Sequence, residues 1–383
     1  MPSPGSVREV FTTFLGLGLT SFGGPVAHLA YYRAALVERR RWLDEASYAD
    51  LVALAQFLPG PTSSQVGVLI GWRRAGWGGA LAAWTAFTLP SALLLAGAAL
   101  IAAQVGPGPW LTGLLAAVVA VVGLAVTGMA RSLCPDLPRG LIALAVAVPL
   151  ILLPHPLTPL LAMMGAGLAG WFLTPGPVVP PGPLTGVPSR RASMILLGLL
   201  AAVVGVVCLP IDHPWMILAR TCVTAGGLVM GGGHVVLPLL RDPLVGAGLL
   251  SDGTFLAGYG AAQAVPGPLF AVAAWLGAAI GGPGAAALAT VAIFAPGLLL
   301  ALGTVRFYRG LMGRPHLARV VRGLNAGVVG LLAAAWWDPI VREGLTSPLA
   351  VGIATGAALA LASGRIPAWA VVLGAGSAGA WWA

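Results

Sequence analysis

Long apolar runs separated by short polar stretches dominate this chain. The runs in the first half cover roughly residues 10–30, 78–103, 110–129, 141–153 and 157–173. A helix of about 20 residues crosses the hydrocarbon core of a bilayer. The pattern therefore predicts an all-α polytopic membrane protein.

Two apolar stretches are interrupted by the same helix-breaking tripeptide. Pro59-Gly60-Pro61 separates residues 47–58 from residues 62–72, and neither piece is long enough to span a bilayer alone. Pro266-Gly267-Pro268 repeats the interruption about two hundred residues later. Such paired breaks predict broken or re-entrant helices near the bilayer midplane, where secondary transporters bind substrates and coupling ions.

Other landmarks recur in the same order, which indicates an internal duplication. The segment 22–25 corresponds to 230–233 at an offset of 208, and 42–45 corresponds to 249–252 at an offset of 207. A Pro-rich stretch near the middle is typical of a semi-rigid linker. We expect an N-terminal repeat at 1–173, a linker at 174–191 and a C-terminal repeat at 192–383.

Arginine distribution predicts that the two repeats insert in opposite orientations. Arg33 and the run Arg39-Arg40-Arg41 lie between the first landmarks, whereas the matching stretch of the second half holds only Arg241. A further pair of landmarks is Phe87-Thr88-Leu89-Pro90 and Phe294-Ala295-Pro296. The bias reverses after this pair, where only the second half is rich in arginine. Arg-rich loops stay cytoplasmic. We therefore expect an inverted-topology repeat with an odd number of crossings per half and about ten in all.

Composition supports the membrane assignment and excludes several classes. The chain is 58% hydrophobic and 8% charged, against about 25% charged in soluble domains. Its net charge is +9, and all of its basic residues are arginine. Arginine suits either anion handling or cytoplasmic loops. The arginines are scattered, so no nucleic-acid partner is expected. The cysteines and histidines lack metal-ligand spacing, and no catalytic constellation or cofactor loop is visible, so we expect no metal, no cofactor and no enzyme.

Several motifs resemble the chromate ion transporter family. Those of its N-terminal half are Ser21-Phe22-Gly23-Gly24-Pro25, Arg41-Trp42-Leu43-Asp44-Glu45, 56–67 and 87–91, and those of its C-terminal half are 231–238 and 258–270. The resemblance covers both halves and implies the long, two-domain type. It implies efflux of chromate from the bacterial cytoplasm across the inner membrane, driven by the proton gradient. Thr62 departs from the family pattern, in which a small residue such as Ala is commoner.

The residues after the first break suit a tetrahedral dianion. A half-helix N-terminus presents free backbone N–H groups and a partial positive charge. Thr62, Ser63 and Ser64 add hydroxyls there, and Gln65 adds an amide. The alternative is a packing kink in which the serines bond back to carbonyls. After Pro268 no hydroxyl follows, so we expect an asymmetric site.

Further residues complete the expected substrate pathway. Glycine runs serve either as additional breaks or as close helix-packing points. A buried arginine either binds the anion or snorkels to the interface. The additional substrate-binding candidates are Gln56, Gln263, Arg220, Gly23, Gly24, Gly231, Gly232 and Gly233.

A separate set of residues is expected to couple protons or gate the pathway. Histidine titrates near neutral pH, and carboxylates beside arginines can take protons or form gating ion pairs. The same charged residues also suit a plain cytoplasmic face. The candidates are His28, His234, Arg33, Glu38, Arg41, Asp44, Glu45 and Asp50.

Two other functions remain open at this point. One is transport or exchange of sulfate or another tetrahedral oxyanion, because size and charge barely separate these anions. The other is an uncoupled oxyanion channel. The expected partners are the oxyanion, protons as coupling ions and membrane lipid, with a homodimer as a further expectation.

Overall fold

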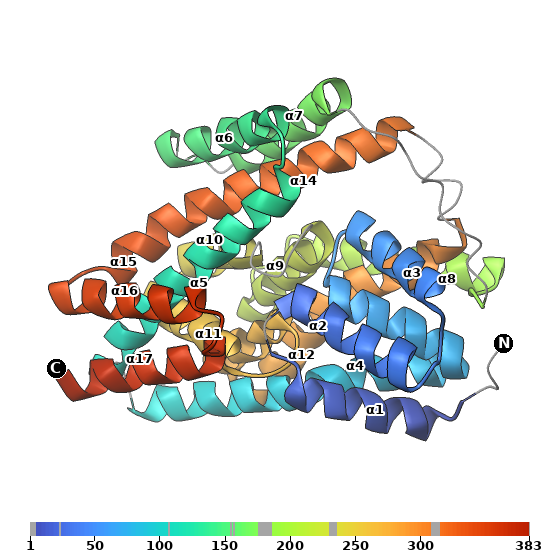
Figure 1. The fold of residues 1–383 in the computed structure, drawn as a ribbon, viewed down its shortest axis with the longest axis horizontal. Coiled ribbons are helices and arrows are strands. Elements are labelled where there is room, and N and C mark those ends of the chain that lie inside the picture. The colour runs from blue at the N-terminus through green and yellow to red at the C-terminus, as the bar shows by residue number, and fades with distance from the viewer. Residues whose placement is uncertain are drawn as a thin grey trace.

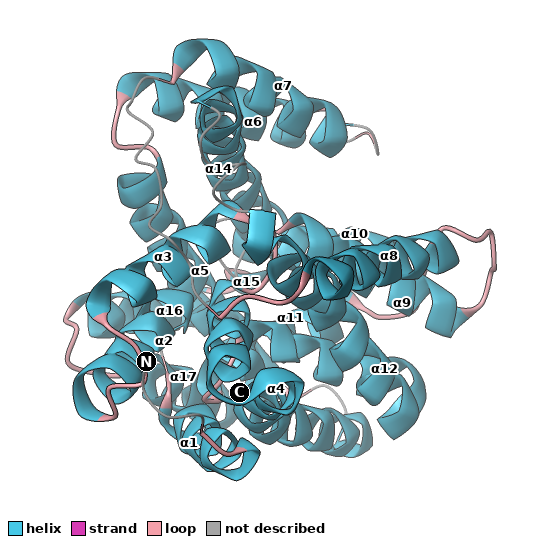
Figure 2. Cartoon of the chain, turned by 90° about the vertical axis from the view of Figure 1, so that its right-hand side faces the viewer, coloured by secondary structure: helices cyan, strands magenta, loops and turns pink. Residues whose placement is uncertain are grey.

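Helices and connecting loops make up the described chain. The computed structural model describes residues 5–22, 24–105, 108–153, 155, 158–174, 186–229, 236–307 and 315–382. Figure 2 shows no strand within these ranges. The expectation of an all-α architecture is confirmed.

The first repeat runs from α1 to α7. Helix N-caps start three of its helices: the side chains of Ser6, Asp44 and Asp136 accept backbone N–H groups at the starts of α1, α3 and α6. The elements are α1 (Val7–Thr20), α2 (Gly24–Tyr32), the π-helix η1 (Arg33–Arg39), α3 (Glu45–Phe57), α4 (Thr62–Val105), α5 (Pro109–Leu133), α6 (Leu137–Leu152) and α7 (Thr158–Leu173).

The remaining helices follow the same order after one additional helix. They are α8 (Arg190–Val207), α9 (Pro214–Leu228), α10 (Val236–Gly246), α11 (Asp252–Ala264), η3 (Leu269–Ala271), α12 (Val272–Thr304), η4 (Val305–Phe307), α14 (Pro315–Ala335), η5 (Trp336–Val341), α15 (Arg342–Gly344), α16 (Pro348–Ala362) and α17 (Ala368–Trp382). At an offset near 207, α9 corresponds to α1, α11 to α3 and α12 to α4. Helix α8 has no counterpart among the described helices of the first half.

The long helices α4 and α12 each fold back at equivalent points. Helical geometry fails at Ala75-Gly76 in α4 and at Gly281-Gly282 in α12. Gly76 and Gly282 have positive φ values of 61° and 72°, which only glycine adopts without strain. Helices α4 and α12 therefore each consist of a short helical arm that turns back along a longer helix. The first arm agrees with the half-helix expected at 62–72.

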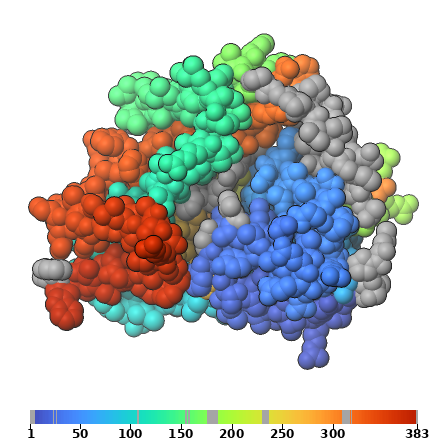
Figure 3. Space-filling model, viewed as in Figure 1, coloured from blue at the N-terminus to red at the C-terminus, as the bar shows by residue number. Residues whose placement is uncertain are grey.

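The two repeats exchange their terminal helix pairs. Figure 1 shows α6 and α7 beside α14, while α16 and α17 pack on α5. Close glycine contacts recur at both places, since a Cβ at Gly113 would meet the Ala375 carbonyl and one at Gly323 would meet the Ala166 carbonyl. On the face in Figure 3, the C-terminal pair also borders the N-terminal helices, where the Phe22 and Trp369 rings lie 6.0 Å apart. Neither half therefore forms its core alone.

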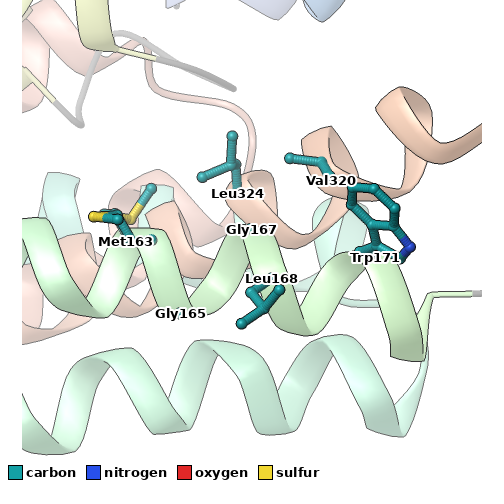
Figure 4. Close-up of a pocket in the computed structure, with 8 residues that line it drawn as sticks. Met163, Gly165, Gly167, Leu168, Trp171, Val320 and Leu324 are labelled. Atoms are coloured by element: carbon teal, nitrogen blue, oxygen red, sulfur yellow. The ribbon is translucent and has the colours of Figure 1, made fainter.

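Five described helical stretches are long and apolar enough to cross a membrane. They are Thr62–Val105, Pro109–Leu133, Arg190–Val207, Leu269–Phe307 and Ala318–Gly344. Shorter apolar helices such as Leu137–Leu152 and Thr158–Leu173 accompany them. An open groove of about 470 Å³ lies between α7 and α14. Figure 4 shows the apolar side chains that line it, such as Met163, Leu168 and Leu324.

Candidate functional site

The first helix break places a helix N-terminus inside the protein. Helix α3 ends at Phe57, the chain passes through Gly60 at φ 126°, and α4 begins at Thr62. The Gln65 N–H donates to the Pro61 carbonyl at 2.9 Å. The three preceding amides lie in the first turn and have no acceptor within the helix. The expected half-helix N-terminus is therefore present, and Ser63 and Ser64 are both buried there.

The second break repeats the backbone but not the side chains. Gly267 has φ 110°, and the short 3-10 helix η3 begins directly after Pro268. Leu269 and Phe270 occupy the positions of Thr62 and Ser63 and are buried. The Phe270 ring packs against Phe294 at 5.8 Å between centroids. This region is apolar, in line with the expected asymmetry.

Reciprocal backbone hydrogen bonds join each break to the other half. The Gly60 N–H donates to the Val229 carbonyl at 2.7 Å, and the Gly267 N–H donates to the Ser21 carbonyl at 2.9 Å. Val229 and Ser21 follow the equivalent helices α9 and α1. Such mutual contacts relate two similar units by an approximate two-fold axis. The breaks therefore lie at the interface between the halves.

Gln65 adds a side-chain link across the same interface. Its Nε2 donates to the Pro59 carbonyl at 2.7 Å and to the Gly297 carbonyl at 3.1 Å. A Cβ on Gly60 would lie 2.6 Å from this Nε2 and 2.8 Å from the Gly297 Cα. Only a glycine leaves room for the amide at this point. The expected amide donor of Gln65 is thus already engaged by carbonyls.

His28 enters the site from α2. Its Nδ1 lies 3.3 Å from the Ser63 Oγ, and its ring packs on Phe87 with 5.2 Å between centroids. The residue is only 1% exposed. The Tyr32 ring packs on the same Phe87 ring, with 5.3 Å between centroids. His28 was expected to couple protons or gate the pathway and Ser63 to bind the substrate. The fold brings these two side chains into contact.

Several buried polar atoms of this region have no hydrogen-bond partner among the described residues. Buried polar groups normally are paired, so orphaned atoms mark where water or a ligand binds. They are Ser21 Oγ, His28 Nε2, Tyr32 OH, Ser64 Oγ, Gln65 Oε1 and Thr88 Oγ1. In the sequence, Ser21 and Thr88 stand out only as members of family motifs, and Tyr32 is not a candidate. Only the packing of α1, α2 and α4 adds their side chains to this region.

The other substrate-binding candidates lie at varied distances from this region. Gln56 is exposed at the end of α3, and Gln263 is half-buried beside the Tyr259 hydroxyl. Arg220 donates to the Val207 and Leu209 carbonyls at the end of α8, both at 2.7 Å. Gly24 has φ 75° at the start of α2. The candidates Gly23, Gly231, Gly232, Gly233 and His234 lie outside the described residues.

The charged gating candidates form an exposed network at the start of α3. Arg33 pairs with Glu38 and with Glu45, both at 2.7 Å. Asp44 accepts the Ser47 N–H at 2.7 Å and caps α3, which lowers the pKa of its carboxyl. Arg41 has a positive φ of 51°, and Asp50 is half-buried with a partner of its own.

An equivalent ion pair occurs in the second half and was missed by sequence analysis. The Arg241 Nε donates to Asp252 Oδ1 at 2.6 Å, as the Arg33 Nε does to Glu45. The repeat offsets already align Arg33 with Arg241 and Glu45 with Asp252, so applying them residue by residue would have found the pair. Arg241 also lies 3.8 Å from Glu343.

Comparison with known proteins assigns the chain to a family. Residues 8–171 and 216–380 both match the model of the chromate transporter family. The chain belongs to the chromate transporter family. It is 30% identical to the chromate transport protein of Pseudomonas aeruginosa, with 99% of this chain and 93% of the relative covered. It is 26% identical to the chromate transport protein of Cupriavidus metallidurans, with 86% and 82% covered.

Some other relatives of this chromate transporter family member carry no substrate in their names. An uncharacterized transporter of Methanocaldococcus jannaschii is 25% identical, with 86% of this chain and 83% of the relative covered. No solved structure matches the chain. The double family match and the long apolar helices identify a multi-pass protein of the bacterial inner membrane with two repeated domains.

Proposed function

We propose that this protein exports chromate from the cytoplasm at the expense of the proton gradient, by alternating access between two inverted halves. Two relatives covering most of the chain are named chromate transport proteins. The oxyanion binds at the N-terminus of α4, between the two halves.

The observation that carries the proposal is the buried, donor-rich first turn of α4. Free backbone amides and the helix dipole favour an anion there. The Ser63 and Ser64 hydroxyls are 3% and 2% exposed, so an anion bound to them is shielded from water. Electrostatic attraction is stronger in such a place than at a surface. The second break offers no comparable set of side-chain donors.

The cross-half contacts of the breaks support alternating access. The anion would touch α4 of one half while Gly60 and Gln65 contact the other half. A relative movement of the halves would then change the exposure of the site to each side of the membrane. Transporters with inverted repeats work by such rocking around a central site.

The extra helix α8 bears on the orientation of the halves. It is long and apolar enough to cross a membrane, and it lies between the repeats. One such crossing between the repeats inverts the second repeat only if each repeat crosses an even number of times, so this proposal replaces the odd number expected from the arginine pattern. Arginines at 33 and 39–41 then face the cytoplasm from the first repeat, where they attract dianions. The boundary expected at 191 remains a prediction.

Coupling to protons is proposed to involve His28. It is the titratable side chain in contact with Ser63, and an exchange of protons there changes the charge felt by the anion. Arg33, Glu38 and Glu45 are proposed to act as a gate at the cytoplasmic entrance.

Radiolabelled chromate flux into everted membrane vesicles tests the function. We expect uptake that increases when a proton gradient, acidic inside the vesicle, is imposed. Flux that ignores the gradient would favour an uncoupled channel and contradict active export. Absence of chromate flux from vesicles that contain the folded protein would overturn the assignment of chromate as substrate.

A further inference from the structure

The orientation of the Gln65 amide is fixed by its neighbours. The nitrogen and oxygen of a glutamine amide are told apart by the hydrogen bonds that they make. Here two carbonyl oxygens, those of Pro59 and Gly297, face one end of the amide at 2.7 and 3.1 Å. Carbonyl oxygens only accept, so this end must be the Nε2 donor. The Oε1 acceptor therefore points elsewhere.

That Oε1 atom is a buried acceptor without a donor among the described residues. Gln65 is 0% exposed, so bulk water does not reach its side chain. Leaving a buried acceptor unpaired is unfavourable, and a site containing one gains affinity for a ligand that brings a donor. A fully deprotonated oxyanion has acceptors only. Such an anion can use the serine hydroxyls and helix amides but cannot pair with this oxygen.

We propose that the site selects a tetrahedral oxyanion that carries a proton. Its O–H donates to the Gln65 Oε1, and its unprotonated oxygens accept from the first turn of α4 and from Ser63 and Ser64. This inference rests on the proposed oxyanion site and names the protonation state that the site prefers. Chromate is partly protonated near neutral pH, as hydrogenchromate, whereas sulfate carries no proton there. The proposal therefore separates two anions of similar size and shape.

Position 65 has no polar counterpart in the second half. Val272 occupies the place of Gln65 in the second half and is buried. Among the described residues, the titratable side chains in contact with this region are His28 and Tyr32, both from α2. A change in the protonation of these side chains alters the affinity of the site in the same way for every anion of the same charge. A comparison of two anions at one pH therefore isolates the contribution of the ligand's own proton.

Competition with arsenate and sulfate at pH 8 is the test. Both are dianions at this pH, but hydrogenarsenate keeps one O–H and sulfate has none. In vesicles with the full chain, we expect arsenate to inhibit chromate flux at least about tenfold more strongly than sulfate, because sulfate leaves the Gln65 oxygen unpaired. Equal inhibition by the two anions overturns the proposal, since the acceptor would then be satisfied without the ligand.

Variants at two glutamines connect the preference to this oxygen. We expect Gln65→Leu to reduce the arsenate-to-sulfate preference to about threefold or less. Gln104→Leu, at an exposed position near the end of α4, is the matched control and should keep the full preference. A preference that survives in Gln65→Leu contradicts the role of Gln65.

A second measurement on the unmodified protein covers the case in which Gln65→Leu does not fold. The KM for total chromate should rise about tenfold per pH unit above the pKa of hydrogenchromate, while inhibition by arsenate changes much less between pH 7 and 9. A KM for chromate that stays flat over this range overturns the inference. Chromate flux that is absent at every pH would instead overturn the proposed function, so the two failures are distinguishable.

Discussion

The two helix breaks have nearly the same backbone and very different surroundings. Gly60 and Gly267 both have positive φ, and each donates its N–H across the interface to the other half. The turn after Pro61 is rich in buried hydroxyls, whereas the turn after Pro268 is packed with Leu269 and Phe270. The two halves thus share the backbone conformation of the break, and only the first half has the buried hydroxyl side chains.

Symmetry of movement and symmetry of binding are therefore separable in this protein. Reciprocal hydrogen bonds need only backbone groups, which any sequence supplies. An anion site needs specific donors, and one copy at the interface is enough to expose it to either side. Variants at equivalent positions measure how far the two halves differ in transport and in stability.

The largest effect is expected from a methyl group at the first break. In Gly60→Ala the Cβ collides with the Gly297 backbone and the Gln65 amide, and backbone strain adds about 1–3 kcal/mol. We expect chromate transport to fall more than tenfold. In Gly267→Ala the nearest atom is the Ser91 Oγ, at 2.8 Å, so adding Ser91→Gly should restore part of the transport. Rescue of Gly60→Ala by Ser91→Gly would contradict this distinction.

Removing the hydroxyls of the first turn should affect transport rather than folding. We expect Ser63→Ala with Ser64→Ala to lower the affinity for chromate about tenfold or more, because two neutral donors near an anion are lost. The protein level in the membrane should not change. Ser132→Ala with Ser363→Ala is the control, since both of these exposed serines bond to their own helices. Unchanged transport kinetics in the first double variant would exclude the α4 site.

The equivalent ion pairs should differ in their contribution to stability. The Arg33 and Glu45 side chains are 49% and 57% exposed, against 22% and 30% for Arg241 and Asp252. We expect Arg33→Gln to lower the free energy of unfolding by less than about 1 kcal/mol, and Arg241→Gln by about 1–3 kcal/mol. Thermal unfolding in detergent measures both. A larger loss from Arg33→Gln would reverse the ranking.

The smallest effect concerns the caps of the equivalent helices α3 and α11. The Ser47 N–H lowers the pKa of Asp44, so its contribution to stability is present above the unfolded-state pKa, near 4. It is lost as the pH falls through the lowered folded-state pKa. Ser251 caps α11 with a hydroxyl and does not titrate in this range. Asp44→Ser should remove this acid-dependent loss, and Ser251→Asp should add one. If the thermal stability of both variants followed the same pH profile, this expectation would be refuted.

Much of the framework was predictable because its signals are local. A Pro-Gly-Pro run interrupts a helix, whereas an isolated proline such as Pro90 lies inside α4, so the end of α3 and the start of α4 followed from Pro59-Gly60-Pro61. The hydroxyls after Pro61 predicted a polar helix start, and the missing hydroxyls after Pro268 predicted an apolar one. The bonds of Gln65 were not predictable, because Gly297 lies 232 residues away along the chain.

By itself, the sequence determined that the chain is helical, apolar, duplicated and broken at two equivalent points. These properties depend on composition, spacing and the conformations open to proline and glycine. The tertiary structure was needed to show that each break bonds to the opposite half, that His28 contacts Ser63, and that the Gln65 oxygen has no donor among the described residues. The physical reason is that hydrogen-bond partners are set by which helices pack together, and this packing joins residues far apart in the chain.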